Sequence, residues 1–278
     1  KCRERCSVKK LTVPILTYHS IDPSGSVIST RPEKFRAQMQ HLRDASVQVM
    51  SLRELVERLR HNEPLPASAV VITFDDGFRN VYEAAYPVLR EFGFPATVFL
   101  VAGLCGSDNQ WPGQPAWTPT WDLLSWDEIA EMAQHGFEFG AHSLNHPDLS
   151  KLSIEQATEE IIGSKSWIQE RLGREVLLFA YPYGRQTPQV RQVVQQHFAG
   201  ACSTELSLVE PTSDCHWLPR IDMYYFSRND LFDLLGTAPF YLYIAWRRGL
   251  RAVRRLYLTW RRCLFSGWPN RSRAAGMR

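Results

Sequence analysis

Seven short apolar runs alternate with polar, amphipathic segments along this chain, and this alternation constrains the fold more than any other feature. It is the pattern expected of parallel β-strands joined by helical crossovers. The sequence therefore predicts an α/β architecture in which strands and helices take turns. We expect strands at residues 13–19, 47–51, 70–75, 96–102, 137–142, 177–182 and 200–203.

Recognisable helix starts lie between these runs. Ser51, Ser125 and Ser153 each precede a Glu or Gln by three residues, which is the spacing of a capping box. Thr187 followed by Pro188 is typical of an N-cap with proline at the first helical position. Seven strand–helix alternations favour an irregular (β/α)7 barrel, although a doubly wound open sheet would give a similar pattern.

The charge of the chain is unevenly distributed. Of the 278 residues, 44% are hydrophobic, enough for one large domain or two small ones. The formal net charge is +3, but residues 1–233 hold 22 basic and 29 acidic residues, and the rest of the chain carries ten arginines and no acid. We therefore expect a basic amino-terminal segment (1–10), a main domain (11–235) and a basic tail (236–278). The six cysteines lack the paired spacing of a structural zinc site.

Four polar motifs, TYHS, TFDDG, GAHS and AYPYG, come at the ends of predicted strands. Because the carboxyl ends of parallel strands meet at one rim, we expect these motifs to gather there in any parallel arrangement. A loop rich in Gly, Pro and Trp is predicted at residues 106–121. Such a loop is either part of a binding rim or a packed structural loop.

Two of these motifs predict a metal site. Asp75 and Asp76 place two like charges at one strand end, which a cation would make tolerable. His142 and His146 are four residues apart, and Pro147 disfavours a helical conformation at His146, so a bent strand end is expected. Taken alone, the two histidines fit ordinary surface or core positions, and Asp75 could instead cap the next helix. Their place on one rim favours the metal.

In this hypothesis Asp76 binds the ion together with His142 and His146, and Asp75 stays ionised beside it as a proton acceptor. A bound divalent ion lowers the pKa of its water from about 15.7 towards about 7 and polarises a carbonyl oxygen, which amide hydrolysis at neutral pH requires. Two histidines and one aspartate suit Zn²⁺ best, while Co²⁺, Ni²⁺ or Fe²⁺ fit similar sets of ligands.

The pairing of TFDDG with HSLNHP resembles the polysaccharide deacetylases with a NodB-homology domain, carbohydrate esterase family 4. The resemblance runs from about Val13 to Asp222. PILTYHSI at the front and FAYPYG at residues 179–184 are similar to the branch that acts on bacterial exopolysaccharides and poly-N-acetylglucosamine. The family resemblance implies a NodB-type (β/α)7 barrel, and so a deacetylase domain, at residues 11–235.

The resemblance also implies roles for individual residues. Asp75 would be the general base, and Asp76, His142 and His146 the metal ligands. Pro182 and Tyr183 would bind the substrate, with the Tyr183 backbone N–H helping to hold the oxyanion of the tetrahedral intermediate.

The chain departs from the family pattern in two motifs. Ala180, Tyr181 and Pro182 stand where many members carry Arg-Pro-Pro, so an arginine that steadies the base is expected to be missing. Arg220 in LPRI stands where a histidine serves as general acid, and arginine cannot donate a proton usefully at neutral pH. The acid is then either His19 or metal-bound water relayed by the base; a buried His19 without a proton role is the alternative.

The tail predicts a basic amphipathic helix, because apolar residues recur at spacings of three and four between arginines, at Trp246, Leu250, Val253, Tyr257, Trp260 and Leu264. Such a helix either lies on an anionic membrane surface or docks on the barrel. Nucleic acid is not expected, since no recognised binding fold accompanies the charge. The longest uncharged stretch there, residues 234–246, is shorter than the about 20 residues of a spanning helix, and the first apolar run is too short for a signal peptide. We expect an extracytoplasmic or membrane-associated location.

The residues and the resemblance together predict a metal-dependent hydrolase that removes N-acetyl groups from amino-sugar residues of a bacterial cell-surface or exported polysaccharide. One alternative is a linear amide hydrolase acting on a small or lipid-linked substrate. The other is a catalytically impaired carbohydrate-binding protein.

Overall fold

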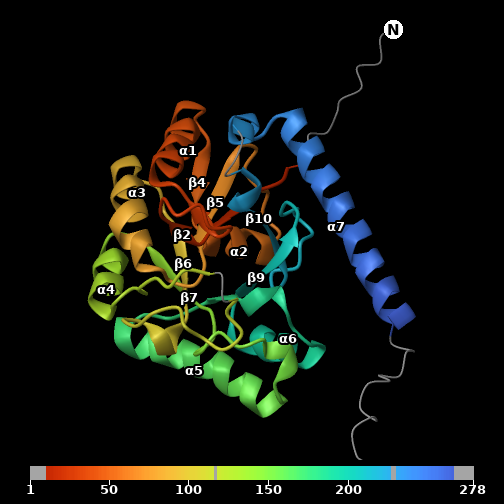
Figure 1. Cartoon of the computed structure of the whole chain (residues 1–278). Coiled ribbons are helices and arrows are strands. Elements are labelled where there is room, and N and C mark those ends of the chain that lie inside the picture. Colours follow the sequence, from red (N-terminus) through yellow and green to blue (C-terminus); the bar gives the residue numbers. More distant parts are fainter. Residues whose placement is uncertain (1–10, 116–117, 227–229, 266–278) are drawn as a thin grey trace, which may run out of the picture. The chain divides into compact units, whose positions relative to one another are not determined.

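The structure of the protein is a computed structural model that describes residues 11–115, 118–226 and 230–265 (Figure 1). The chain divides into two compact units, Lys1–Leu235 and Gly236–Arg278. The first unit holds the strands and the helices α1 to α6, and the second holds the helix α7.

Seven parallel strands form a closed ring in the first unit (Figure 1). The ring closes because β1 pairs with β10 on one side and with β5 on the other. This closure confirms the predicted (β/α)7 barrel and rules out an open doubly wound sheet. The barrel strands are β1 (Ile15–Tyr18), β5 (Ala69–Phe74), β6 (Thr97–Leu100), β7 (Glu138–Ala141), β8 (Leu178–Ala180), β9 (Gly200–Leu206) and β10 (Leu218–Asp222).

All seven predicted strands are present, but one of them lies outside the ring. β4 (Gln48–Met50) pairs with residues 69–71, the first half of β5. The strand that completes the ring is β10, which the sequence pattern missed because Pro219 and Arg220 interrupt its apolar run. A small parallel pair, β2 (Ser20–Ile21) and β3 (Ser29–Thr30), follows β1.

Helices connect the strands and surround the ring (Figure 1). A π-helical turn, η1 (Val81–Ala85), runs directly into α3, and α6 begins after the predicted cap Thr187, whose hydroxyl accepts from Val190 N. The helices are α1 (Pro32–Asp44), α2 (Leu52–Arg60), α3 (Tyr86–Phe92), α4 (Trp126–Gln134), α5 (Ile154–Leu172) and α6 (Pro188–His197).

The predicted capping boxes form fully at two of three helices. Ser125 and Ser153 each accept a hydrogen bond from the third helical residue, whose side chain bonds back to the serine N–H. At Ser51 only the serine half forms. The carboxylate of Glu54 instead accepts a hydrogen bond from Arg58 one turn along α2, at 3.0 Å. The prediction is therefore confirmed for the start of this helix and wrong for the reciprocal bond from Glu54 to Ser51.

A cluster of buried apolar side chains supports the barrel. It includes Val71, Phe99 and Leu218 from three strands, together with Leu55 and Val56 of α2. The predicted polar motifs follow β1, β5, β7 and β8, so in this parallel ring they lie at the carboxyl rim. The sequence prediction that they share one rim is confirmed.

The second unit is built on α7 (Ala238–Phe265), a continuous helix of 28 residues. The predicted tail helix is confirmed, but it begins before Trp246. Leu242, Trp246 and Leu250 follow one another at spacings of four and share a helix face, and Arg247 and Arg251 belong to a different face. No helix within the described ranges is both long and apolar enough to cross a membrane.

Candidate metal centre and active site

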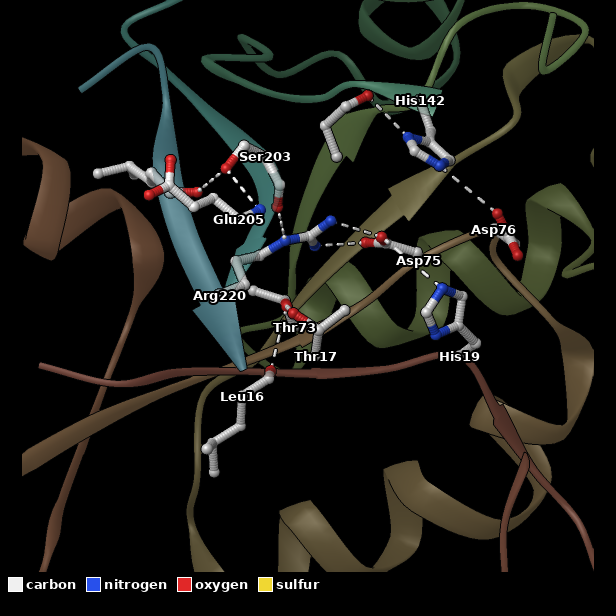
Figure 2. Close-up of polar contacts among 12 residues, drawn as sticks. Leu16, Thr17, His19, Thr73, Asp75, Asp76, His142, Ser203, Glu205 and Arg220 are labelled. Atoms are coloured by element: carbon white, nitrogen blue, oxygen red, sulfur yellow. Dashed lines mark hydrogen bonds and ion pairs between the residues drawn. The ribbon is translucent and has the colours of Figure 1, made fainter. Parts of the chain in front are cut away.

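The two adjacent aspartates end up in one site because the chain turns sharply between them. All six residues of β5 are buried, and the N–H of Asp75 still pairs with β1 by donating to Tyr18 O at 3.0 Å. Asp76 then adopts a left-handed backbone, with φ at 71°, and Gly77 follows at 73°. Successive side chains of a continuing strand would point to opposite faces. The turn brings both carboxylates to the same rim instead, as Figure 2 shows.

The two histidines come from a bent strand end, as predicted. β7 stops at Ala141, and the N–H of His142 donates to Leu100 O at 2.8 Å. Ser143 and His146 both have left-handed backbones, with φ at 66° and 56°. The hydroxyl of Ser143 accepts from His146 N at 2.9 Å, which closes the turn.

Three buried ligand atoms converge at this rim. Nε2 of His142 and Nε2 of His146 are 3.2 Å apart, and Asp76 Oδ1 lies 3.5 Å from the first and 3.3 Å from the second. A tetrahedral metal with bonds of about 2.0–2.1 Å separates its ligand atoms by about 3.3 Å. The three predicted ligands therefore fit one divalent ion, and within the described residues they form a set that could hold one.

A hydrogen bond of His142 fixes how its ring faces this point. Nδ1 of His142 lies 2.7 Å from Ala180 O, and because a carbonyl can only accept, Nδ1 carries a proton and Nε2 is the ring atom that faces Asp76. Figure 2 shows His142 turned toward Asp76. Nδ1 of His146 is buried and has no hydrogen-bond partner among the described residues.

Burial and charge act against each other in this cluster. Burial lowers the pKa of His146 to about 3, and it outweighs the nearby charge of Asp76. Burial also opposes the charged form of His142, but the hydrogen bond to Asp76 and the charges of both aspartates leave the pKa of His142 raised. Burial would raise the pKa of Asp76, yet its contacts with the histidines leave that pKa lowered. The carboxylate is thus ionised and the lone pair of His146 is available, as metal binding requires.

Arg220 holds the carboxylate of Asp75 in a bidentate ion pair. Nη1 and Nη2 of Arg220 each donate to a different oxygen of Asp75 at 2.7 Å, and Nε donates to Ser203 O at 2.9 Å (Figure 2). Both partners are buried. Burial alone would raise the pKa of Asp75, but the Arg220 guanidinium holds that pKa well below its usual range.

The expectation that the base lacks a steadying arginine is therefore wrong. The guanidinium comes from β10, not from the end of β8, where Ala180 stands. The sequence signal was present in LPRI: an arginine inside a short apolar segment is almost never buried without a carboxylate partner.

His19, the candidate acid, also reaches Asp75. Its Nε2 lies 4.0 Å from Asp75 Oδ2, and its side chain is 21% exposed. Asp75 lies between Arg220 and His19 in Figure 2. His19 is thus the more accessible of the two groups beside the carboxylate, and it is neither fully buried nor locked into an ion pair of hydrogen-bond length.

Aromatic side chains enclose His146. The rings of Trp111 and Tyr183 have their centroids 4.4 Å and 4.6 Å from the imidazole centroid. Trp111 belongs to the long predicted loop and is buried, so this part of the loop packs against a candidate ligand. Tyr183 lies in η4 (Pro182–Gly184), has a left-handed backbone with φ at 57°, and remains 37% exposed. The turn predicted to bind the substrate therefore lies beside His146.

Comparison with known proteins gives a consistent picture. The family model described as polysaccharide deacetylase matches residues 62–199. A putative polysaccharide deacetylase of Bacillus subtilis, YxkH, is 29% identical over 188 residues, covering 68% of this chain and 62% of that protein. A poly-β-1,6-N-acetyl-D-glucosamine N-deacetylase of Staphylococcus aureus is 27% identical over 205 residues, covering 69% of this chain and 67% of that protein. The matches thus span about two thirds of these relatives.

Two solved structures share the fold. The Streptococcus pyogenes deacetylase PplD, solved in complex with acetate, has a TM-score of 0.67 and 26% identity, covering 77% of this chain and 92% of PplD. IcaB from Ammonifex degensii has a TM-score of 0.68 and 24% identity, covering 81% of this chain and 95% of IcaB. The second likeness supports the barrel alone.

Proposed function

The chain belongs to the polysaccharide deacetylase family, and from this premise we propose that it hydrolyses N-acetyl groups on amino-sugar residues of a bacterial cell-surface or exported polysaccharide, with a divalent metal ion, most simply Zn²⁺. One observation carries the proposal: the convergence of Asp76, His142 and His146 directly beside the arginine-held carboxylate of Asp75. The names of the Staphylococcus aureus relatives make β-1,6-linked N-acetylglucosamine the first polymer to test.

A divalent ion held by these ligands would polarise the acetyl carbonyl and lower the pKa of the attacking water. The water forms a new C–O bond to the acetyl carbon while Asp75 accepts its proton. Because both oxygens of Asp75 are held by Arg220, the carboxylate keeps one orientation and stays ionised at neutral pH. The Tyr183 backbone N–H donates to the developing oxyanion.

The carbon–nitrogen bond then breaks, and the amine leaves with a proton. We assign this donation to His19, because it is partly exposed and lies beside Asp75. Arg220 cannot perform it, since its guanidinium is fixed by the ion pair and does not lose a proton at neutral pH. The products are acetate and a free amino sugar.

The test is acetate release from β-1,6-linked N-acetylglucosamine oligomers and from chitooligosaccharides, with and without a chelator. We expect release by the parent that the chelator abolishes and added Zn²⁺ restores. The Asp75→Asn variant should bind one equivalent of metal, as the parent does, but release no acetate.

Each alternative predicts a different outcome of the same assay. Acetate from small amides alone would replace the proposal with a small-molecule amide hydrolase. Sugar binding without release by the metal-loaded parent would replace it with a carbohydrate-binding protein.

A second proposal concerns α7, which we suggest lies on an anionic membrane surface. At about 100° per residue, Leu242, Trp246 and Leu250 fall on one arc of the helix, and Arg248 and Arg251 fall on the opposite one. Arginine near an anionic surface contributes about 1 kcal/mol per residue, so the helix combines apolar insertion with charge attraction.

A further inference from the structure

The backbone between the two candidate histidine ligands holds an unusual shape. Ser143 and His146 are not glycines, yet both are left-handed. Each such residue costs about 1–2 kcal/mol relative to ordinary backbone. Conformations of this kind persist only when surrounding contacts determine them. The contacts of the intervening residues, Leu144 and Asn145, should therefore decide whether the imidazoles meet.

Glu160, in the middle of α5, makes the principal side-chain contacts to this segment. Its Oε2 accepts hydrogen bonds from the backbone N–H groups of both Leu144 and Asn145, at 2.9 Å each. Its Oε1 accepts a third, from Asn145 Nδ2 at 2.8 Å. Successive backbone N–H groups that point to one side form a concave anion site. In this molecule the anion is a carboxylate of the chain itself.

The other side of the segment rests on the turn after β6. Gly103 N donates to Leu144 O at 2.9 Å, and Ala102 N donates to Ser143 O at 3.1 Å. The approach is so close that a Cβ on Gly103 would lie 2.8 Å from Leu144 O. Residues 143–145 are thus held by hydrogen bonds from two sides, from η2 (Ala102–Leu104) and from α5. On the α5 side the partner is the charged carboxylate of Glu160.

We propose that Glu160 is a positioning residue for the metal centre. It does not touch the three ligand atoms; it fixes the backbone of Leu144 and Asn145, and through it the approach of His142 to His146. The proposal rests on the proposed function for the presence of a metal. Its consequence is that the ligand pair is formed before the ion arrives, so that removing Glu160 weakens metal binding itself.

The experiment measures the affinity of the full chain for Zn²⁺ and Co²⁺ by competition with a chromophoric chelator. Glu160→Ala should weaken both affinities by about 10- to 100-fold, the usual effect of removing a group that orients metal ligands. Glu160→Gln should recover most of the loss, because an amide oxygen can accept the two backbone bonds while the amide N–H₂ donates to a flipped Asn145 side chain. Glu159→Ala, at the exposed neighbouring position, is the matched control and should leave the affinities unchanged.

Urea unfolding of the metal-free variants separates positioning from simple support of the fold. The proposal would be overturned if Glu160→Ala lowers the stability of the fold but keeps the metal affinity within twofold of the parent. It would also be overturned if Glu159→Ala weakens the metal affinity as much as Glu160→Ala does. If Glu160→Ala does not fold, Glu160→Asp decides, because its shorter side chain cannot keep all three hydrogen bonds. A folded Glu160→Asp variant with weaker Co²⁺ binding and an altered Co²⁺ absorption spectrum supports positioning, and the affinity and spectrum of the parent contradict it. Metal binding is measured without substrate, so failure to release acetate would refute the proposed function and leave this result standing.

Discussion

The buried ion pair between Asp75 and Arg220 gives the sharpest prediction for stability. The two side chains are 5% and 3% exposed and share two hydrogen bonds of 2.7 Å. Arg220→Met removes the guanidinium and leaves an uncompensated carboxylate in the barrel. Breaking a buried pair in this way costs about 3–5 kcal/mol. We expect a loss of this size in the free energy of unfolding.

An exposed arginine–carboxylate pair provides the control. Arg36 also donates two hydrogen bonds to one carboxylate, that of Glu91, but these side chains are 51% and 48% exposed. Arg36→Met should therefore cost no more than about 1 kcal/mol. The assay is urea unfolding in the presence of a chelator, so that metal binding does not add to the stability of the parent.

The double variant Asp75→Asn, Arg220→Met tests whether the cost comes from the unpaired charge. Because neither charge remains, it should be more stable than Arg220→Met by about 2 kcal/mol or more, a clear departure from additivity. The reasoning is refuted if Arg220→Met costs no more than Arg36→Met, or if the two substitutions at the buried pair simply add.

The pH dependence of the same comparison has a defined sign. The pKa of Asp75 is lowered in the folded state, so at acid pH the unfolded chain takes up this proton first. The stability contributed by the pair is therefore complete above the unfolded pKa of about 3.9 and declines as the pH falls toward the folded value. The advantage of the parent over the double variant should shrink below about pH 4.

Two further predictions address the acid and the tail. His19→Asn should lower kcat by about 10²- to 10⁴-fold, with little change in KM and with one equivalent of metal retained; an unchanged kcat would remove His19 from the mechanism. The full chain should sediment with anionic vesicles and not with neutral ones, whereas a chain that ends at Asp233 should do neither. Equal sedimentation of the two chains would refute the membrane proposal.

The features that the sequence predicted are those encoded within a few residues. The capping serines, the strand that ends at Asp75 and the bent turn between His142 and His146 each depend on neighbours in the chain. Parallel topology then collects the strand ends at one rim whatever the details of the sheet. This is why the candidate ligands could be grouped before the fold was known.

The features that the sequence did not predict depend on distant partners. Arg220 pairs with Asp75 across 145 positions, and no local pattern marks the pairing. β10 was missed because that buried arginine interrupts its apolar run. Glu160 occupies an ordinary position of an amphipathic helix, and only the packing of α5 beside the turn after β7 reveals its contacts.

The closure of the ring through β1 has a consequence for synthesis of the protein. Among the barrel strands β1 is made first, but one of its two neighbours, β10, is made last. A nascent chain that stops short of Leu218 has an unpaired edge on β1 and no counter-charge for Asp75. Such a chain cannot finish folding during translation, and exposed strand edges of this kind are sites of aggregation. When synthesis is slow, the chain should therefore depend on chaperones until its last barrel strand has been made.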